Sequence, residues 1–262
     1  MPPIVLSVAG FDPSSGAGVT ADLKTIAAHG GYGVGCITAL TVQSTQGVSR
    51  VEPVSGSTVT ETLEKLAADV EIAAVRVGML GSAEVALAVA AWLASQKQRN
   101  VVVDPIIRAS SGEFLLEPAG LEVLTKRMFP LTAVVTPNWA EAAMLTRGEV
   151  RNLTEAAGAA EALQQMGARN VLITGGHSEQ NTDLLRLESG ETHQIPGRKV
   201  ASKATHGTGC ALATAIACNL ANGMDVLGAA KAAKEYVRQA IEAAYPIGKG
   251  SGPMNHLYKL KD

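Results

Sequence analysis

The sequence predicts an α/β protein with a mostly parallel central sheet, helices on both faces and an antiparallel hairpin at one edge. Short apolar runs alternate with segments of helical periodicity along most of the chain. Several of these runs end directly in glycine or polar residues, as strands of open sheets do. Between residues 183 and 195 the alternation of strand and helix gives way to two short strand-like runs around Ser189-Gly190, which indicates the hairpin.

The apolar runs and the periodic segments give the predicted elements. Parallel strands are expected at Ile4–Ala9, Cys36–Val42, Ala74–Val77, Val101–Val103, Ala133–Val135 and Val171–Ile173. Helices are expected at Val19–His29, Thr58–Asp69, Glu84–Lys97, Leu121–Met128, Glu155–Met166, Gly209–Asn222 and Val226–Ala243. No linker, repeat or low-complexity segment interrupts this pattern, so we expect a single domain over residues 1–262.

Composition narrows the class of protein. The 262 residues are 47% hydrophobic, enough for one sizeable core. Only 18% are charged, the net charge is −2 and aromatics make up 3%, which argues against a nucleic-acid or membrane-surface partner. Three cysteines give neither a disulfide framework nor zinc spacing. The N-terminus lacks a basic leader and no apolar run is long enough to span a bilayer, so a cytoplasmic location is expected.

Polar segments gather at the ends of the predicted strands. They are Gly10-Phe11-Asp12, Asp104-Pro105, Thr136-Pro137-Asn138 and Gly175-Gly176-His177. In open α/β sheets, ligands bind beyond the carboxyl ends of the strands. A binding site is therefore expected at this edge.

The run Thr205–Cys210 has the features of a phosphate-binding loop. Gly207 and Gly209 bracket it, and an Ala-rich helix follows at once, so free backbone N–H groups would point at one spot. Placed at a γ-phosphate, such an anion hole would stabilise phosphoryl transfer. Cys210 lies in the first helical turn, where the helix dipole is expected to lower its pKa and let it accept a proton from a hydroxyl. The alternative is a plain helix cap with a small buried cysteine.

The segment from Ala9 to Gly18 is a second glycine-rich loop, between a strand and a helix. It matches neither the dinucleotide fingerprint nor the Walker A pattern. One interpretation is a loop that closely approaches a small substrate, with Asp22 on the following helix as an orienting acceptor. The other is an ordinary turn.

Other candidates follow strands or open helices. Asp104, Asn138 and Glu141 have the oxygen ligands to hold Mg²⁺, mostly through water, although Asn138 and Glu141 also fit a helix capping box. Gln43 can pair with the donor–acceptor edge of a heterocycle and Met79 can pack on its face, unless both are simple strand-end residues.

Taken together and in this order, the segments resemble the ribokinase superfamily, and more narrowly the hydroxymethylpyrimidine/phosphomethylpyrimidine kinases. The most specific pieces are residues 9–18 with 21–25, 37–40 with Gln43, 77–80, 136–138 with 141–142, and 205–210. Most ribokinase-like enzymes carry Asp where this chain has Cys210. The cysteine form is shared by the pyrimidine kinases and a related group of pyridoxal kinases.

The resemblance implies a ribokinase-like fold and a homodimer that uses ATP and Mg²⁺ to phosphorylate 4-amino-5-hydroxymethyl-2-methylpyrimidine and then its monophosphate. Carried over by position, Asp22, Gln43, Met79 and Ile106 would line the pyrimidine pocket. The Mg-ATP side would take Asp104, Asn138, Glu141, Thr174 and Thr208, with Asp104 and Glu141 at the metal. Gly207, Gly209 and Cys210 would form the anion hole and the catalytic base.

The chain departs from the family pattern in three places. Thr174 stands where members often have lysine before Gly-Gly-His, which removes a phosphate-contacting cation. Ser251 replaces a usual histidine, in a segment expected to be a lid or nearby loop. Arg108 is an unusual cation that would supply the charge missing at Thr174.

Two other functions compete with the pyrimidine kinase. Pyridoxal is also a flat heterocycle with a hydroxymethyl arm, and Gln43 favours the aminopyrimidine only mildly. A non-catalytic precursor-binding regulator on the same fold is the third possibility, which intact Gly207, Gly209 and Cys210 disfavour.

Overall fold

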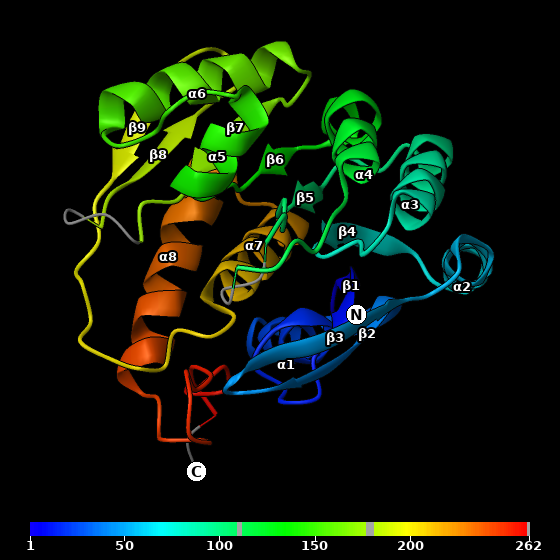
Figure 1. Cartoon of the computed structure of the whole chain (residues 1–262), viewed down its shortest axis with the longest axis horizontal. Coiled ribbons are helices and arrows are strands. Elements are labelled where there is room, and N and C mark those ends of the chain that lie inside the picture. Colours follow the sequence, from blue (N-terminus) through cyan, green and yellow to red (C-terminus); the bar gives the residue numbers. More distant parts are fainter. Residues whose placement is uncertain (109–111, 177–180, 261–262) are drawn as a thin grey trace.

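A computed structural model describes residues 1–108, 112–176 and 181–260. Within them, nine strands form one sheet in the order β3-β2-β1-β4-β5-β6-β7-β8-β9 (Figure 1). The strands are β1 Ile4–Phe11, β2 Tyr32–Ser44, β3 Gly47–Pro53, β4 Ile72–Val77, β5 Val101–Val103, β6 Val134–Val135, β7 Asn170–Ile173, β8 Asp183–Arg186 and β9 Thr192–Ile195. Neighbouring strands from β2 to β7 are parallel. The predicted mostly parallel sheet is confirmed.

Both edges of the sheet are antiparallel, whereas the sequence predicts such an edge on one side only. The predicted hairpin at residues 183–195 is β8 with β9, and β8 also pairs antiparallel with β7. The edge that was missed is β3, which turns back along the far end of β2. Its residues 47–53 are exposed or half-buried throughout, so they carry no apolar run to reveal a strand.

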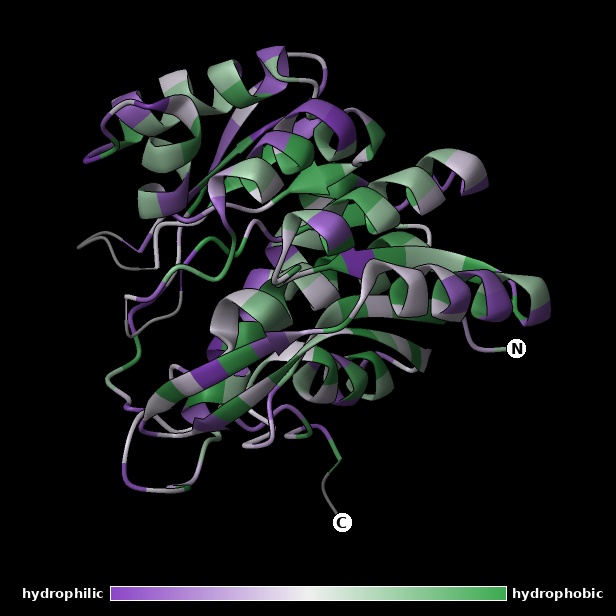
Figure 2. Ribbon diagram, turned by 45° about the vertical axis from the view of Figure 1, so that its right-hand side comes forward, coloured by the Kyte–Doolittle hydropathy of each residue, from purple (hydrophilic) through white to green (hydrophobic). Residues whose placement is uncertain are grey.

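Helices cover the sheet in two layers (Figure 1). One face carries α2 Gly56–Asp69, α3 Ala83–Gln96, α4 Pro118–Val123, α5 Trp139–Thr146 and α6 Leu153–Gln165. The other carries α1 Gly18–Ala28, α7 Thr208–Ala221 and α8 Val226–Glu242. Along β1, Val5 packs into the second layer and Leu6 into the first, as the two-residue period of a strand requires. Both faces are thus buried, and the central strands are largely hydrophobic (Figure 2).

Helix α7 lies at the centre of its layer and brings its first turn to the carboxyl ends of the strands. Every residue from Cys210 to Leu220 is buried. The small residues on this helix, alanine above all, allow close approach to β1, β4 and β5. This packing fixes where the preceding loop lies. None of the helices among the described residues is long and apolar enough to cross a membrane.

Candidate active site

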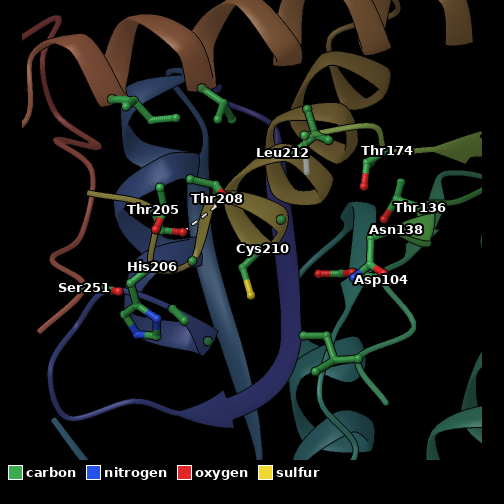
Figure 3. A pocket seen from close by; sticks show the side chains of 18 of the residues that line it. Asp104, Thr136, Asn138, Thr174, Thr205, His206, Thr208, Cys210, Leu212 and Ser251 are labelled. Carbon is green, nitrogen blue, oxygen red and sulfur yellow. Dashed lines mark hydrogen bonds between the residues drawn. The ribbon is translucent and has the colours of Figure 1, made fainter. Parts of the chain in front are cut away.

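The polar strand ends converge on one cavity of about 1460 Å³. Among its lining residues are Asp12 after β1, Met79 after β4, Asp104 after β5, Asn138 after β6 and Thr174 after β7. The last three are labelled in Figure 3. A site for one small molecule usually takes roughly 300–1,000 Å³. The cavity therefore has room for two ligands side by side.

The loop of residues 205–210 forms one wall of this cavity and opens α7. Gly207 is the N-cap residue, at a φ of 76°, a left-handed conformation that favours glycine. A Cβ at Gly207 would overlap the carbonyl oxygen of Gly16, so the two glycine loops touch. Thr208 Oγ1 donates to the carbonyl oxygen of Thr205 at 3.2 Å (Figure 3). The first N–H groups of α7 have no acceptor within the helix, and the residues that carry them line the cavity, an arrangement that suits an anion.

Cys210 projects from the first turn of α7 into the cavity, close to Asp104 (Figure 3). Its side chain is buried, with 8% of the residue exposed. Burial, helped by the nearby carboxyls of Asp104 and Asp22 and opposed by Arg76, raises the pKa of the thiol to about 11. The predicted fall in the pKa of Cys210 is therefore wrong, because desolvation outweighs the dipole of the helix.

Asp22 does not line the cavity, contrary to the role carried over for it. Its side chain on α1 is fully buried behind Cys210, where it accepts hydrogen bonds from Ser7 Oγ at 2.6 Å and from Thr214 Oγ1 at 2.7 Å. It also binds Arg76, a fully buried arginine of β4. Helical periodicity gives only the face of α1 on which Asp22 lies, and that face packs on the protein interior.

Arg76 links Asp22 to Asp104 at the cavity. Its guanidinium donates to Asp22 Oδ2 at 3.0 Å and to Asp104 Oδ2 at 2.9 Å. Gly78 leaves the space for this group, since a Cβ there would overlap the guanidinium. These two carboxylates hold the pKa of Arg76 above its usual value despite burial. Sequence reasoning missed Arg76 because it reads as one charge inside an apolar strand.

Asn138 and Glu141 form the capping box of α5 and also line the cavity. Asn138 Oδ1 accepts from the N–H of Glu141, and Glu141 Oε2 accepts from the N–H of Asn138, both at 2.9 Å. Burial and the neighbouring Asp104 raise the pKa of Glu141 to about 8. Two crowded carboxyls suit a divalent cation, although no cluster of three or more potential metal ligands occurs among the described residues. They fit Mg²⁺ held largely through water.

A second cluster of polar side chains in the cavity surrounds His206. Its Nε2 lies 2.7 Å from Asp12 Oδ2 and 3.1 Å from the side-chain amide of Gln43. Burial alone would raise the pKa of Asp12, but hydrogen bonds from His206 and Ser14 lower it to about 2. Met79 and Ile106 line the same cavity. Neither Asp12 nor His206 has a spacing that sequence analysis recognises, because residues 194 positions apart meet here.

The three departures from the family pattern, Thr174, Arg108 and Ser251, also line this cavity, as does Thr208. Arg108 stacks its guanidinium 3.8 Å from the centre of the Phe114 ring. Ser251 belongs to a segment that packs on the turn between β2 and β3, where the N–H of Gly250 donates to Thr45 Oγ1 at 3.2 Å. His177, at the end of the predicted Gly-Gly-His segment, lies outside the described residues.

Comparison with solved structures defines the class. The chain superimposes on the ADP complex of pyridoxal kinase from Bacillus subtilis with a TM-score of 0.90 and 28% identity, each chain covered completely. It superimposes on phosphomethylpyrimidine kinase from Clostridium difficile with a TM-score of 0.81 and 34% identity, over 91% of this chain and 99% of the other. The fold is that of the ribokinase-like vitamin kinases.

Sequence comparison gives the family. Residues 12–255 match the phosphomethylpyrimidine kinase family, and the chain belongs to it. It is 41% identical to the hydroxymethylpyrimidine/phosphomethylpyrimidine kinase of Rhizobium meliloti, over 99% of this chain and 98% of that protein. It is 42% identical to the thiamine biosynthesis bifunctional protein ThiED of Geobacter sulfurreducens, over 98% of this chain but only 53% of that protein. The chain thus spans about half of the Geobacter protein.

Proposed function

We propose that this protein transfers the γ-phosphoryl group of ATP to the hydroxymethyl oxygen of 4-amino-5-hydroxymethyl-2-methylpyrimidine, and then to the resulting monophosphate, in thiamine diphosphate biosynthesis. The observation that carries the proposal is the arrangement of the cavity. A helix-opening glycine loop with Cys210, a carboxyl pair and the Gln43 amide line one space that is large enough for a nucleotide and a small acceptor. Membership of the phosphomethylpyrimidine kinase family supports it.

The loop and Cys210 would act on the reacting groups. The N–H groups at Gly207 to Cys210 would hold the oxygens of the transferring phosphoryl group as charge builds on them. The hydroxymethyl oxygen attacks phosphorus, the bond from phosphorus to ADP breaks, and the hydroxyl proton passes to the thiolate of Cys210. The raised pKa makes this thiolate a strong base once it has formed.

Asp104 and Glu141 would hold Mg²⁺ beside the phosphates. Their shared burial makes them costly to ionise together, a cost that a cation at this position would offset. When bound, Mg²⁺ neutralises charge on phosphate oxygens. Asn138 would stay committed to the capping box that orients Glu141.

A kinase assay with three acceptors tests the function. We expect ADP formation with the aminopyrimidine alcohol and with its monophosphate, and much less with pyridoxal. Omission of Mg²⁺ should abolish turnover of all three. Turnover of pyridoxal at a higher kcat/KM than the pyrimidine would contradict the proposal and support a pyridoxal kinase.

The pyridoxal kinase remains the second candidate because of one observation. The solved structure with the higher of the two TM-scores above is a pyridoxal kinase. Sequence identity points the other way, at 41% to a curated pyrimidine kinase against 28% to that structure. The amide of Gln43, which matches an amino–ring nitrogen edge, also favours the pyrimidine.

Thr174 should make the second phosphorylation the slower one. We expect a kcat/KM for the free alcohol at least about tenfold above that for the monophosphate, since a hydrogen bond to a charged group contributes about 1.5–3 kcal/mol. Thr174→Lys should narrow this ratio, whereas Thr192→Lys, at an exposed position of β9, should leave it unchanged. Equal kcat/KM values for both acceptors in the wild type would contradict the prediction.

A homodimer and a cytoplasmic location complete the proposal. Strand β2 exposes apolar side chains at Ile37, Leu40 and Val42, which suits burial against a second copy. A sedimentation mass of one chain would argue against the dimer.

The cysteines are free thiols, as expected in a reducing compartment, and cell fractionation tests the location.

A further inference from the structure

We propose that His206, held by Asp12, is a specificity-determining residue: it fixes the orientation of the Gln43 amide and so lets the enzyme tell a 4-aminopyrimidine from a 4-oxopyrimidine. The inference rests on the proposed function, in which Gln43 reads the edge of the acceptor ring. His206 directly precedes the anion-binding residues, so the same loop would also contribute to substrate selection.

The carboxylate of Asp12 requires a proton on the facing nitrogen of His206. Asp12 is buried, and its other partners are all donors: the N–H and Oγ of Ser14 at 2.8 and 2.7 Å, and the N–H groups of Gly16 and Ala17 at 3.2 and 2.9 Å. An ionised carboxylate only accepts hydrogen bonds. His206 Nε2, 2.7 Å from Asp12 Oδ2, therefore carries a hydrogen and donates it.

The same nitrogen then selects one face of the Gln43 amide. In the structure the amide nitrogen of Gln43 lies 3.1 Å from this ring nitrogen, which sets donor against donor. A protonated ring nitrogen has no lone pair to offer, so we assign the amide the other way round, with its oxygen toward His206. The other end of the amide lies 3.2 Å from Thr41 Oγ1; this end is the oxygen in the structure and becomes the nitrogen in the turned amide. Since the hydroxyl of Thr41 donates to the carbonyl oxygen of Phe11 at 2.9 Å, it is free to accept from the amide nitrogen. In this orientation the single hydrogen on Nε2 is shared between Asp12 Oδ2 and the Gln43 oxygen, and no donor faces a donor.

Thr41 by itself would not fix the amide. Its hydroxyl hydrogen can turn from Phe11 to Gln43, so Thr41 tolerates either end of the amide, whereas His206 tolerates only the oxygen. His206 is itself well anchored. Its ring lies against Gly16, where any Cβ would overlap it, and its backbone N–H donates to the carbonyl oxygen of Gly252 at 3.2 Å. The orientation of Gln43 thus depends on one well-held donor.

A fixed amide distinguishes two otherwise similar pyrimidines. The 4-amino ring presents a donor on its amino group and an acceptor at N3, which complement the remaining oxygen lone pair and N–H of Gln43. The 4-oxo analogue reverses this order, with an acceptor at the 4-position and a hydrogen on N3. It would set acceptor against acceptor and donor against donor, and unpaired polar groups in a site cost much affinity.

The test compares kcat/KM for 4-amino-5-hydroxymethyl-2-methylpyrimidine and for its 4-oxo analogue. We expect the wild type to prefer the amino compound by about 100-fold or more. His206→Ala should free the amide and reduce the preference by about tenfold or more, and His206→Phe, which refills the ring space, should do the same. His206→Gln keeps an N–H at about the same place and should retain most of the preference. His193→Ala on β9, outside the cavity, is the control.

The ratio of kcat/KM for the 4-amino compound to that for the 4-oxo compound, compared across the variants, tests the role of His206. The proposal is overturned by an unchanged preference in both His206→Ala and His206→Phe, or by an equal loss in His206→Gln, which would indicate general damage to the loop. A wild type that accepts both pyrimidines equally would overturn it as well. Turnover of neither pyrimidine would refute the proposed function itself, and this inference with it. If His206→Ala fails to fold by thermal melting, the comparison of His206→Phe with His206→Gln still decides.

Discussion

Replacing Cys210 with alanine is expected to lower kcat for the pyrimidine alcohol by about 10²- to 10⁴-fold, the usual contribution of a positioned general base. The KM values for both substrates should change little, because the side chain is small and the phosphate-facing N–H groups stay in place. Steady-state kinetics of ADP formation measure both parameters. Full activity of Cys210→Ala would remove the thiol from the mechanism.

The pH profile separates loss of a base from loss of packing. Only the thiolate accepts a proton, and the pKa of Cys210 lies at about 11. Wild-type kcat/KM should therefore rise as the pH increases from about 6 to about 9. The residual activity of Cys210→Ala should lack that rise. Cys218→Ala, also in α7 but buried outside the cavity, provides the control for removal of a thiol from this helix.

The position of the site was predictable from the sequence, whereas its electrostatics were not. Strand ends are visible as apolar runs that stop at glycine or polar residues, so the sequence alone assigns Asp104, Asn138 and Gly176 to one edge of the sheet. All three line the cavity. The pKa of Cys210 depends on how deeply the first turn of α7 is packed and on carboxyls from α1 and β5. These are tertiary properties that local sequence does not encode.

The residues that were missed share a physical cause. Arg76 finds its partners 54 and 28 positions away in the chain, and His206 meets Asp12 across 194 positions. No periodicity or motif reports such distant pairs. For β3 the difficulty is different, because an exposed edge strand is stabilised by backbone pairing with β2 and needs no apolar pattern.

The second large effect concerns stability: Arg76→Met is expected to lower the free energy of unfolding by about 3–5 kcal/mol, because it leaves two buried carboxylates without their cation. The side chains of Arg76 and Asp22 are fully buried and that of Asp104 nearly so. Equilibrium urea unfolding measures the change. The matched control is Arg50→Met, whose pair with Glu52 is more than half exposed and should contribute only about 0–1 kcal/mol.

The double variant Arg76→Met with Asp22→Leu tests whether unpaired charge is the cause. Of the two carboxylates, Asp22 is destabilised more by the loss of its cation, since it is fully buried and does not line the cavity. If stranded charge is what destabilises Arg76→Met, removal of Asp22 should restore part of the lost stability, so that the two changes are not additive. Equal destabilisation by Arg76→Met and Arg50→Met, or strict additivity in the double variant, would contradict this account. Partial recovery would show that Arg76 serves to balance the two buried carboxylates of Asp22 and Asp104.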